Sequence, residues 1–344
     1  MAFTSAKKNH GKDINWDSLN RDVSWVRNMA AEQKKVADDN NSNLIYDDRC
    51  PVCDTKNTKY FIEIYGYTYR QCQDDGHIFL ANKPAPQAIA DLYTSEEKQS
   101  AQHIVYMNAD LFEKRAQMIG YPKVEFVDKF VEKAERKAGS PYWLDIGCGT
   151  GELLTAAMKN GCRVRGIESD SNEVDFARKK GIDVVEEYVS SNMNKKIFID
   201  VDVVSCINIV EHILNPKEFL SNIISCMQSG CIIVTEVPRH PSLSSFVNVT
   251  QPGVAYRHIC SPDHMHIFTD NSLEIILNGL GCSAKAVWYF GQDIYNYFVT
   301  SIAQAKNKID SNFIDAIYKL IPKLQHTIDE EGYSDTLFVV AVKG

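Results

Sequence analysis

The amino-acid sequence predicts an α/β fold built on a doubly wound, mostly parallel sheet of seven strands. From residue 142 onward, short apolar stretches alternate with helical patterns, the arrangement that places helices on both faces of a parallel sheet. A glycine-rich turn, residues 147–151, directly follows the first apolar stretch. Such a turn is typical of the ligand-binding edge of these sheets. The 344 residues suffice for about two domains and a large core.

Each element of this fold has its own signal. The expected strands are short runs rich in Val, Ile and aromatic residues, at 142–146, 163–167, 183–185, 202–208, 231–237, 284–289 and 336–342. The expected helices carry apolar residues three or four positions apart, at 152–160, 171–180, 216–227, 272–278 and within about 292–330.

The whole chain divides into four expected regions. They are a polar arm with one helix (1–45), a small unit with two cysteine corners (46–82), a helical linker or lid (83–138) and the core (139–344), interrupted by a helical insertion at about 291–334. The arm's helix is indicated by apolar residues at helical spacing between residues 16 and 30, and the polar run 38–43 reads as a linker. Most aromatics of the insertion are expected in its core.

Composition narrows the function classes. The net charge is −8, which argues against a general binder of nucleic-acid phosphates. No apolar run approaches the roughly 20 residues that span a bilayer. Residues 1–20 contain no apolar signal core, so we expect a cytoplasmic protein whose ten cysteines are reduced.

The turn LDIGCGTG, residues 144–151, favours a ligand without phosphates. A dinucleotide fingerprint would need glycine at position 152, where Glu152 stands, and a phosphate loop would end in Gly-Lys-Ser/Thr. Glu168 ends the second strand, 23 positions after Asp145. A carboxylate there can accept hydrogen bonds from both hydroxyls of a ribose.

Together with VDVVSCINIVEHI at residues 201–213, these motifs resemble the class I S-adenosylmethionine-dependent methyltransferases over about residues 136–290. The resemblance implies a Rossmann-like fold, S-adenosyl-L-methionine as cofactor and methyl transfer by in-line attack. By analogy, the cofactor contacts are expected at Asp145, Gly147, Cys148, Gly149, Glu168, Ser169, Asn208 and Tyr106. An adenine contact is expected within residues 185–190, and Arg115 is expected to help close over the cofactor.

Three histidines are candidate general bases, because imidazole can take a proton near neutral pH. His212 lies in the Glu-His run after the fourth strand and His240 follows the fifth strand. His264 matches the histidine of a Glu-His-x-x-x-Phe-Thr segment of the resembled family, with Asp263 in place of glutamate. Polar packing is the alternative for each histidine, and a metal site of His258, His264 and His266 is another alternative.

The cysteine corners predict a zinc-ribbon-like unit. Cys50 and Cys53 form a C-x-x-C pair, and Cys72 follows nineteen positions after Cys53. A fourth cysteine would fall at position 75, where Asp75 stands, so the fourth ligand is either His77 or Asp75. The segment resembles the N-terminal zinc-binding segment of some C- and O-methyltransferases of sugar and antibiotic pathways. A decayed site that persists by aromatic packing is the alternative to bound zinc.

The combined prediction is an enzyme that methylates oxygen or carbon of a small molecule. The zinc-ribbon resemblance implies a sugar or sugar-linked acceptor, in carbohydrate biosynthesis. The alternatives are a protein or RNA methyltransferase, which the acidic charge disfavours, and a non-catalytic cofactor-binding regulatory or scaffold protein. The sequence does not determine the oligomeric state, and a homodimer is compatible with it.

Overall fold

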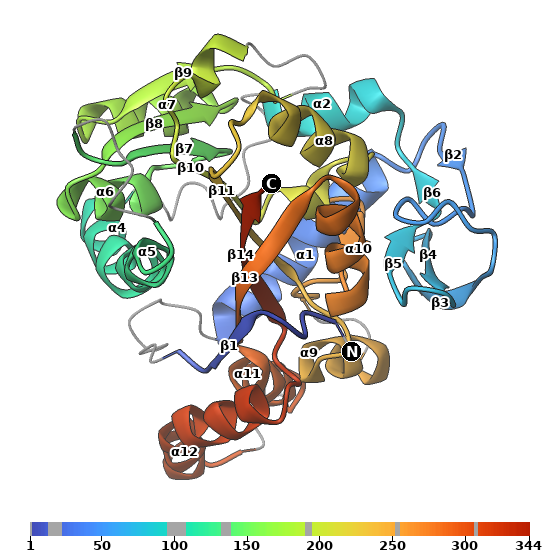
Figure 1. Ribbon diagram of the computed structural model, residues 1–344. Coiled ribbons are helices and arrows are strands. Elements are labelled where there is room, and N and C mark those ends of the chain that lie inside the picture. Colours follow the sequence, from blue (N-terminus) through green and yellow to red (C-terminus); the bar gives the residue numbers. More distant parts are fainter. Residues whose placement is uncertain are drawn as a thin grey trace. The chain divides into compact units, whose positions relative to one another are not determined.

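The computed structural model describes residues 2–12, 23–94, 108–131, 139–189, 195–251, 255–305 and 309–344 (Figure 1). The chain forms two compact units that do not follow chain order. The first unit comprises residues 1–85, 237–275 and 287–338, and the second comprises residues 86–236, 276–286 and 339–344.

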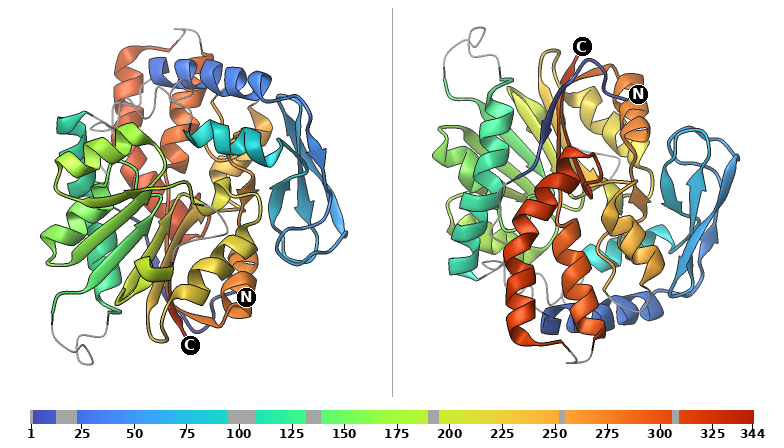
Figure 2. Two further views of the ribbon diagram at one scale, coloured as in Figure 1. Left: turned by 90° about the horizontal axis from the view of Figure 1, so that it is seen from above. Right: turned by 90° about the horizontal axis from the view of Figure 1, so that it is seen from below.

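The seven predicted core strands are present, and the α/β fold class is confirmed. They are β7 (Tyr142–Ile146), β8 (Arg163–Glu168), β9 (Asp183–Glu186), β10 (Val203–Ile207), β11 (Ile232–Pro238), β13 (Cys282–Phe290) and β14 (Thr336–Lys343). In the second unit, β9, β8, β7, β10 and β11 are successive parallel neighbours (Figure 2). Their carboxyl ends therefore meet at one edge of the sheet, where the candidate site lies.

The sheet has one strand more than predicted. Its order is β1-β13-β14-β11-β10-β7-β8-β9, and the eighth strand, β1 (Lys7–His10), belongs to the polar arm. The sequence of β1 gives no strand signal because its side chains are mostly exposed at the sheet edge and do not alternate. Just after β1, the Gly11 amide donates to the Tyr289 carbonyl (2.8 Å), and the Trp288 indole donates to the Gly11 carbonyl (2.7 Å).

Helices flank the strands of the second unit. They are α2 (Pro86–Thr94), α4 (Ala109–Arg115), a π-helical turn (Ala116–Gly120), α5 (Tyr121–Asp128), α6 (Glu152–Lys159), α7 (Ser171–Lys179) and α8 (Pro216–Cys226). Capping residues explain where two of these helices begin. The Asp170 carboxylate accepts from the first amides of α7, and Pro216 opens α8 after the cap Asn215.

The cysteine-bearing segment of the first unit is part of a four-stranded antiparallel sheet. Its order is β12-β5-β4-β3, formed by β3 (Thr58–Ile64), β4 (Tyr67–Cys72), β5 (Ile78–Leu80) and β12 (His266–Ile267). A second pair joins β2 (Ile45–Tyr46) to β6 (Asn82–Lys83). The strand β12 comes from far along the chain, with His266 opposite Phe79 and Ile267 opposite Ile78. The zinc-ribbon-like segment is therefore completed by residues that follow the fifth core strand.

The remaining helices are α1 (Val23–Asp39), α9 (Leu243–Thr250), α10 (Asp270–Gly279), α11 (Asp293–Gln304) and α12 (Ser311–Glu330). Within the described residues α1 extends to Asp39, past the expected end of the arm's helix and into the run read as a linker. The sequence analysis did not foresee α9, which begins with a capping box formed by Ser242 and Ser245. The helices α11 and α12 confirm the helical insertion before the last strand.

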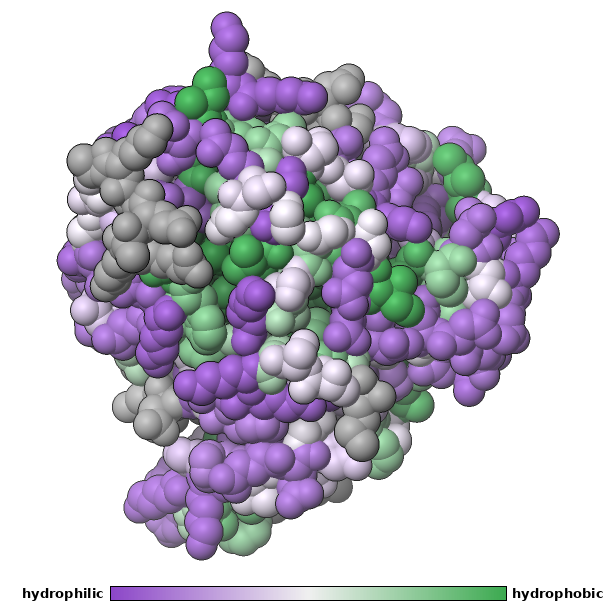
Figure 3. Space-filling model, viewed as in Figure 1, coloured by the Kyte–Doolittle hydropathy of each residue, from purple (hydrophilic) through white to green (hydrophobic). Residues whose placement is uncertain are grey.

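The face drawn in Figure 3 is hydrophilic around its rim, and hydrophobic residues gather toward its centre. In the part of the chain that is described, no helix combines the length and the apolar character that a membrane crossing needs.

Candidate functional site

The glycine-rich turn of the second unit connects β7 to α6 and depends on glycine for steric reasons. Gly147, Gly149 and Gly151 all have positive φ, at 70°, 53° and 88°. A Cβ at Gly151 would lie 2.3 Å from Ile182 Cδ1, and one at Gly147 would lie 2.6 Å from Ile209 Cδ1. The close approach at Gly147 means that the segment after β10 packs directly against the turn.

Glu168 lies over this turn, as predicted from the spacing. Its Oε2 accepts a hydrogen bond from the Gly149 amide (2.9 Å), and its Oε1 accepts from the amides of Ser169 (2.6 Å) and Asp170 (3.0 Å). The carboxylate of the second strand is thus fixed against the turn that follows the first. Three backbone donors hold the side chain of Glu168 in a defined orientation.

Further acidic side chains surround the turn. Glu173 lies close to Gly149, since a Cβ there would be 3.6 Å from Glu173 Oε2. Burial, followed by repulsion from Glu168, raises the pKa of Glu173 to about 9. Arg115, which was expected to help close over the cofactor, donates a hydrogen bond to Glu152 (2.8 Å), the first residue of α6. Glu173 is therefore protonated at neutral pH, and the charge of Glu152 is compensated by Arg115.

Two of the predicted contact residues serve the packing of the sheet. The Asp145 side chain is buried and accepts from Ser205 Oγ (2.5 Å), and burial raises its pKa to about 8. The Cys148 sulfur occupies the space over Gly166, where a Cβ would lie 2.4 Å from it. Both side chains are therefore occupied by contacts within the sheet.

A buried ion pair adjoins the predicted contact Asn208. Asn208 has φ of 51°, and its amide donates to the Glu236 carbonyl (2.9 Å) while its side chain reaches Glu236 Oε1 (3.4 Å). Glu236 Oε2 lies 2.5 Å from Lys123 Nζ, and these side chains are 6% and 5% exposed. The sequence analysis missed both partners. The one available signal was a single charge, Glu236, inside an otherwise apolar strand.

His212 lies at the same edge of the sheet as the glycine-rich turn. It ends the helical turn Val210–His212, directly after the Ile209 that packs on Gly147. Its Nδ1 is 2.9 Å from Tyr93 Oη, and the Tyr93 carbonyl accepts from Ser169 Oγ (3.3 Å). Tyr93 in α2 therefore bridges the segment after β8 and the segment after β10. No specific sequence signal marked this tyrosine.

The structure does not cover all of the expected cofactor contacts. Tyr106 lies outside the described residues. The stretch 185–190, expected to contact adenine, is described up to residue 189, and it includes the half-buried Tyr188. Burial raises the pKa of the Tyr188 hydroxyl.

The other candidate bases belong to the first unit. His240 is 3.0 Å from Ser245 Oγ through Nδ1 and 3.3 Å from Gln71 Nε2 through Nε2. Burial, followed by the charge of Arg239, lowers the pKa of His240 to about 4, so the ring is neutral at pH 7. His264 Nδ1 lies 2.9 Å from the His258 carbonyl oxygen.

The alternative metal site of His258, His264 and His266 does not form. The side chains grouped with His264 within the first unit are Cys260 and Asp263. The buried His266 instead faces His77, with 3.1 Å between His266 Nδ1 and His77 Nε2.

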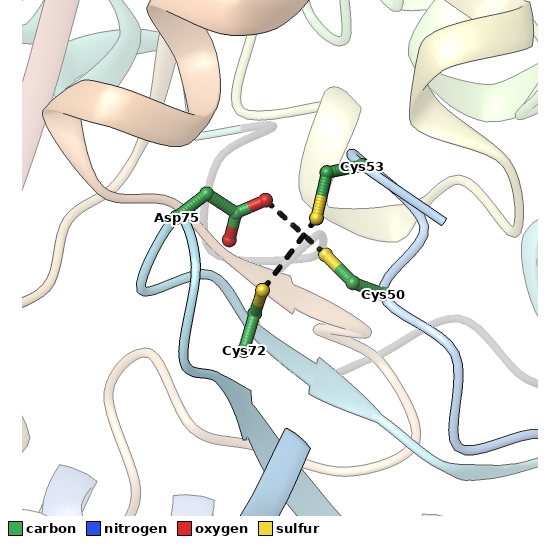
Figure 4. Close-up of side chains that lie close together, drawn as sticks. All are labelled: Cys50, Cys53, Cys72 and Asp75. Atoms are coloured by element: carbon green, nitrogen blue, oxygen red, sulfur yellow. Dashed lines mark hydrogen bonds between the residues drawn. The ribbon is translucent and has the colours of Figure 1, made fainter. Parts of the chain in front are cut away.

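The cysteine corners converge in the first unit, as Figure 4 shows. Cys50 Sγ is 3.3 Å from Asp75 Oδ2, and Cys53 Sγ is 3.6 Å from Cys72 Sγ. The fourth member of this cluster is Asp75 and not His77. Asp75 occupies the corner between β4 and β5, whereas His77 lies next to β5 with its ring directed at His266.

Comparisons with known proteins give one consistent family. A family profile described as a methyltransferase domain matches residues 115–286, which are 172 of the 344 residues. The ubiquinone biosynthesis O-methyltransferase of Rickettsia prowazekii (strain Madrid E) is 24% identical over 201 residues, covering 53% of this chain and 79% of that protein. The enzyme of the same name from Rickettsia typhi (strain ATCC VR-144 / Wilmington) is 23% identical over 217 residues, covering 56% and 87%. Among solved structures, a SAM dependent methyltransferase from Archaeoglobus fulgidus has a TM-score of 0.46 and 21% identity, covering 71% of this chain and 100% of that chain.

Proposed function

Because the chain belongs to the class I S-adenosylmethionine-dependent methyltransferases, we propose that it methylates a hydroxyl oxygen of a small molecule, with His212 as general base. The observation that carries the proposal is the position of His212 at the sheet edge that holds the glycine-rich turn and Glu168. The curated relatives are named O-methyltransferases, which supports oxygen as the acceptor atom. A sugar or sugar-linked acceptor rests on the zinc-ribbon resemblance alone.

On the cofactor side, Glu168 would accept hydrogen bonds from the two ribose hydroxyls, and the backbone of residues 147–149 would hold the amino-acid part. S-adenosylmethionine supplies a methyl group already activated by the positive sulfur. The protein then has to align the acceptor oxygen and remove its proton.

On the acceptor side, His212 removes that proton through Nε2. In this assignment Nδ1–H donates to Tyr93 Oη at 2.9 Å, which fixes the tautomer and leaves Nε2 as the basic nitrogen. Glu211 Oε1 lies 4.0 Å from Nε2 and stabilises the ring once it is protonated. The pair of Tyr93 and Glu211 would thus orient and support the base.

The test is the rate of S-adenosylhomocysteine formation by His212→Asn with a panel of phenols, sugars and nucleotide sugars. We expect kcat to fall by about 10²–10⁴-fold, the loss typical of a general base, while S-adenosylmethionine affinity stays unchanged. His326→Asn is the control, because His326 is an exposed histidine of α12 paired with Glu330. Transfer that is undiminished in His212→Asn, or transfer to carbon acceptors alone, would contradict the proposal.

A further inference from the structure

The cysteine corner of the first unit has the dimensions of a tetrahedral metal site. One ligand atom from each of Cys50, Cys53, Cys72 and Asp75 lies within 4.8 Å of every other. A zinc ion with bonds of about 2.3 Å to sulfur holds its sulfurs roughly 3.8 Å apart. The 3.6 Å between Cys53 and Cys72 and the 3.3 Å between Cys50 and Asp75 are close to that geometry. In Figure 4 the four side chains point toward a common centre.

The charges of this corner also call for a cation. Cys50, Cys72 and Asp75 are buried, and Cys53 closes the corner from its exposed side. Three thiols and a carboxylate this close together gain most from a divalent ion, which deprotonates thiols and compensates their charge.

We propose that Cys50, Cys53, Cys72 and Asp75 bind one zinc ion, and that this ion fixes the histidine loop, residues 257–269, onto the zinc-ribbon-like segment. The ligand set is three thiolates and one carboxylate, with Asp75 where a ribbon would carry its fourth cysteine. Zinc accepts this set because it binds carboxylate oxygen at about the same distance as histidine nitrogen.

Asp75 connects the ion to the histidine loop through its own backbone. The Asp75 carbonyl accepts from Thr269 Oγ1 (2.7 Å), and Asp75 Oδ1 accepts from the His77 amide (2.8 Å). The backbone at Gly76 packs tightly against Thr269, since a Cβ at position 76 would lie 3.0 Å from Thr269 Cγ2. A displacement of Asp75 therefore reaches the end of the histidine loop.

Other bonds extend this junction along the whole loop. Tyr69 Oη donates to the His264 carbonyl (2.7 Å), and the Leu80 amide donates to the Met265 carbonyl (2.9 Å). Ser261 Oγ donates to the Ile64 carbonyl (3.0 Å). The ion would therefore support an antiparallel sheet to which the histidine loop contributes β12, with His266, while His264 lies just before that strand.

Metal content of the purified full chain tests the ligand set. We expect about one zinc per chain in the wild type by plasma emission spectrometry, and less than about a tenth of that in Cys72→Ser. Asp75→Asn keeps an acceptor for the His77 amide but loses the charge, so we expect affinity to fall by about 10–100-fold. Asp75→Cys supplies a fourth thiolate, so we expect it to keep about one zinc per chain. The control is Cys226→Ser, because Cys226 is a half-buried cysteine of α8.

Cobalt substitution identifies the donor atoms independently of stability. The wild type should give a thiolate-to-cobalt charge-transfer absorption that strengthens in Asp75→Cys and weakens in Cys53→Ser. Reduced thiols without metal in the zinc-supplemented wild type would overturn the proposal. A Cys53–Cys72 disulfide in the protein as purified, detected by mass spectrometry, would overturn it as well.

Hydrogen exchange tests the effect on the loop without any acceptor. Chelation of the metal should speed amide exchange in peptides from residues 257–269 by on the order of tenfold, and leave peptides from β7 and β8 unchanged. S-adenosylmethionine affinity should stay the same. Unchanged exchange in the loop after metal loss would refute the coupling. Because no step depends on methyl transfer, a failure of the proposed function would not affect these results.

Discussion

The glycine-rich turn and the cysteine corner are both short motifs, but they acquire their partners at very different sequence distances. Gly149 meets Glu168 nineteen residues along the chain. By contrast, Asp75 and Tyr69 of the ribbon bond to Thr269 and His264, which lie 194 and 195 residues away. The two regions therefore differ in how far their surroundings follow from the sequence.

The difference has a geometric origin. Successive parallel strands bring their carboxyl ends to one edge, so chain order alone predicts that Glu168 and Asn208 lie near the turn. Antiparallel addition of a short strand such as β12 (His266–Ile267) obeys no comparable rule. Its two residues are buried and give no period.

The largest expected effect tests the local region. Glu168→Gln keeps the size of the side chain and removes its charge, so each ribose hydroxyl loses a charged acceptor. We expect S-adenosylmethionine to bind about 100-fold more weakly by calorimetry, or about 2.7 kcal/mol. The matched control is Glu186→Gln, which changes the carboxylate at the corresponding position of the neighbouring strand β9. Equal effects of the two substitutions would break the assignment of Glu168.

The strands and the cofactor edge were predictable because their signals are local. Apolar runs predicted all seven core strands, and the motif spacing predicted that Glu168 ends the strand next to the one that precedes the turn. The polar strand β1 was missed because buried and exposed side chains do not alternate along it. The helix α9 was missed because several of its buried side chains are polar, so the sequence shows no apolar stripe. Tyr93 and Lys123 were missed because a single side chain in a helix carries no sign of its distant partner.

The choice between His77 and Asp75 shows the same limit within the six residues 72–77. Both have acceptable spacing from Cys72, and histidine is the commoner zinc ligand of the two. The pairing of β5 with β12 decides the outcome, because it turns the His77 ring toward His266. A tertiary contact 189 residues away thus selects the member of the cluster.

A smaller effect tests the long-range region. Tyr69→Phe removes the hydroxyl that donates to the His264 carbonyl and leaves that buried acceptor without this donor. We expect the free energy of unfolding to fall by about 1–2 kcal/mol in denaturant titrations. The pH dependence of methyl transfer should not change. Tyr60→Phe, at an exposed position of β3, is the control. A pH–rate profile altered by Tyr69→Phe would mean that the histidine loop takes part in proton transfer.

The smallest expected effect comes from a tyrosine-to-phenylalanine substitution at the sheet edge that carries the glycine-rich turn. Tyr93→Phe also removes one phenol hydroxyl, but this hydroxyl contacts the His212 ring directly. We expect kcat to fall about fivefold, near 1 kcal/mol, with the free energy of unfolding changed by less than about 0.5 kcal/mol. The acid limb of the pH–rate profile should move to lower pH, because the protonated ring loses an acceptor. Since the two tyrosine substitutions delete the same atom, a reversed pattern would assign the base to the histidine loop and leave His212 a packing role.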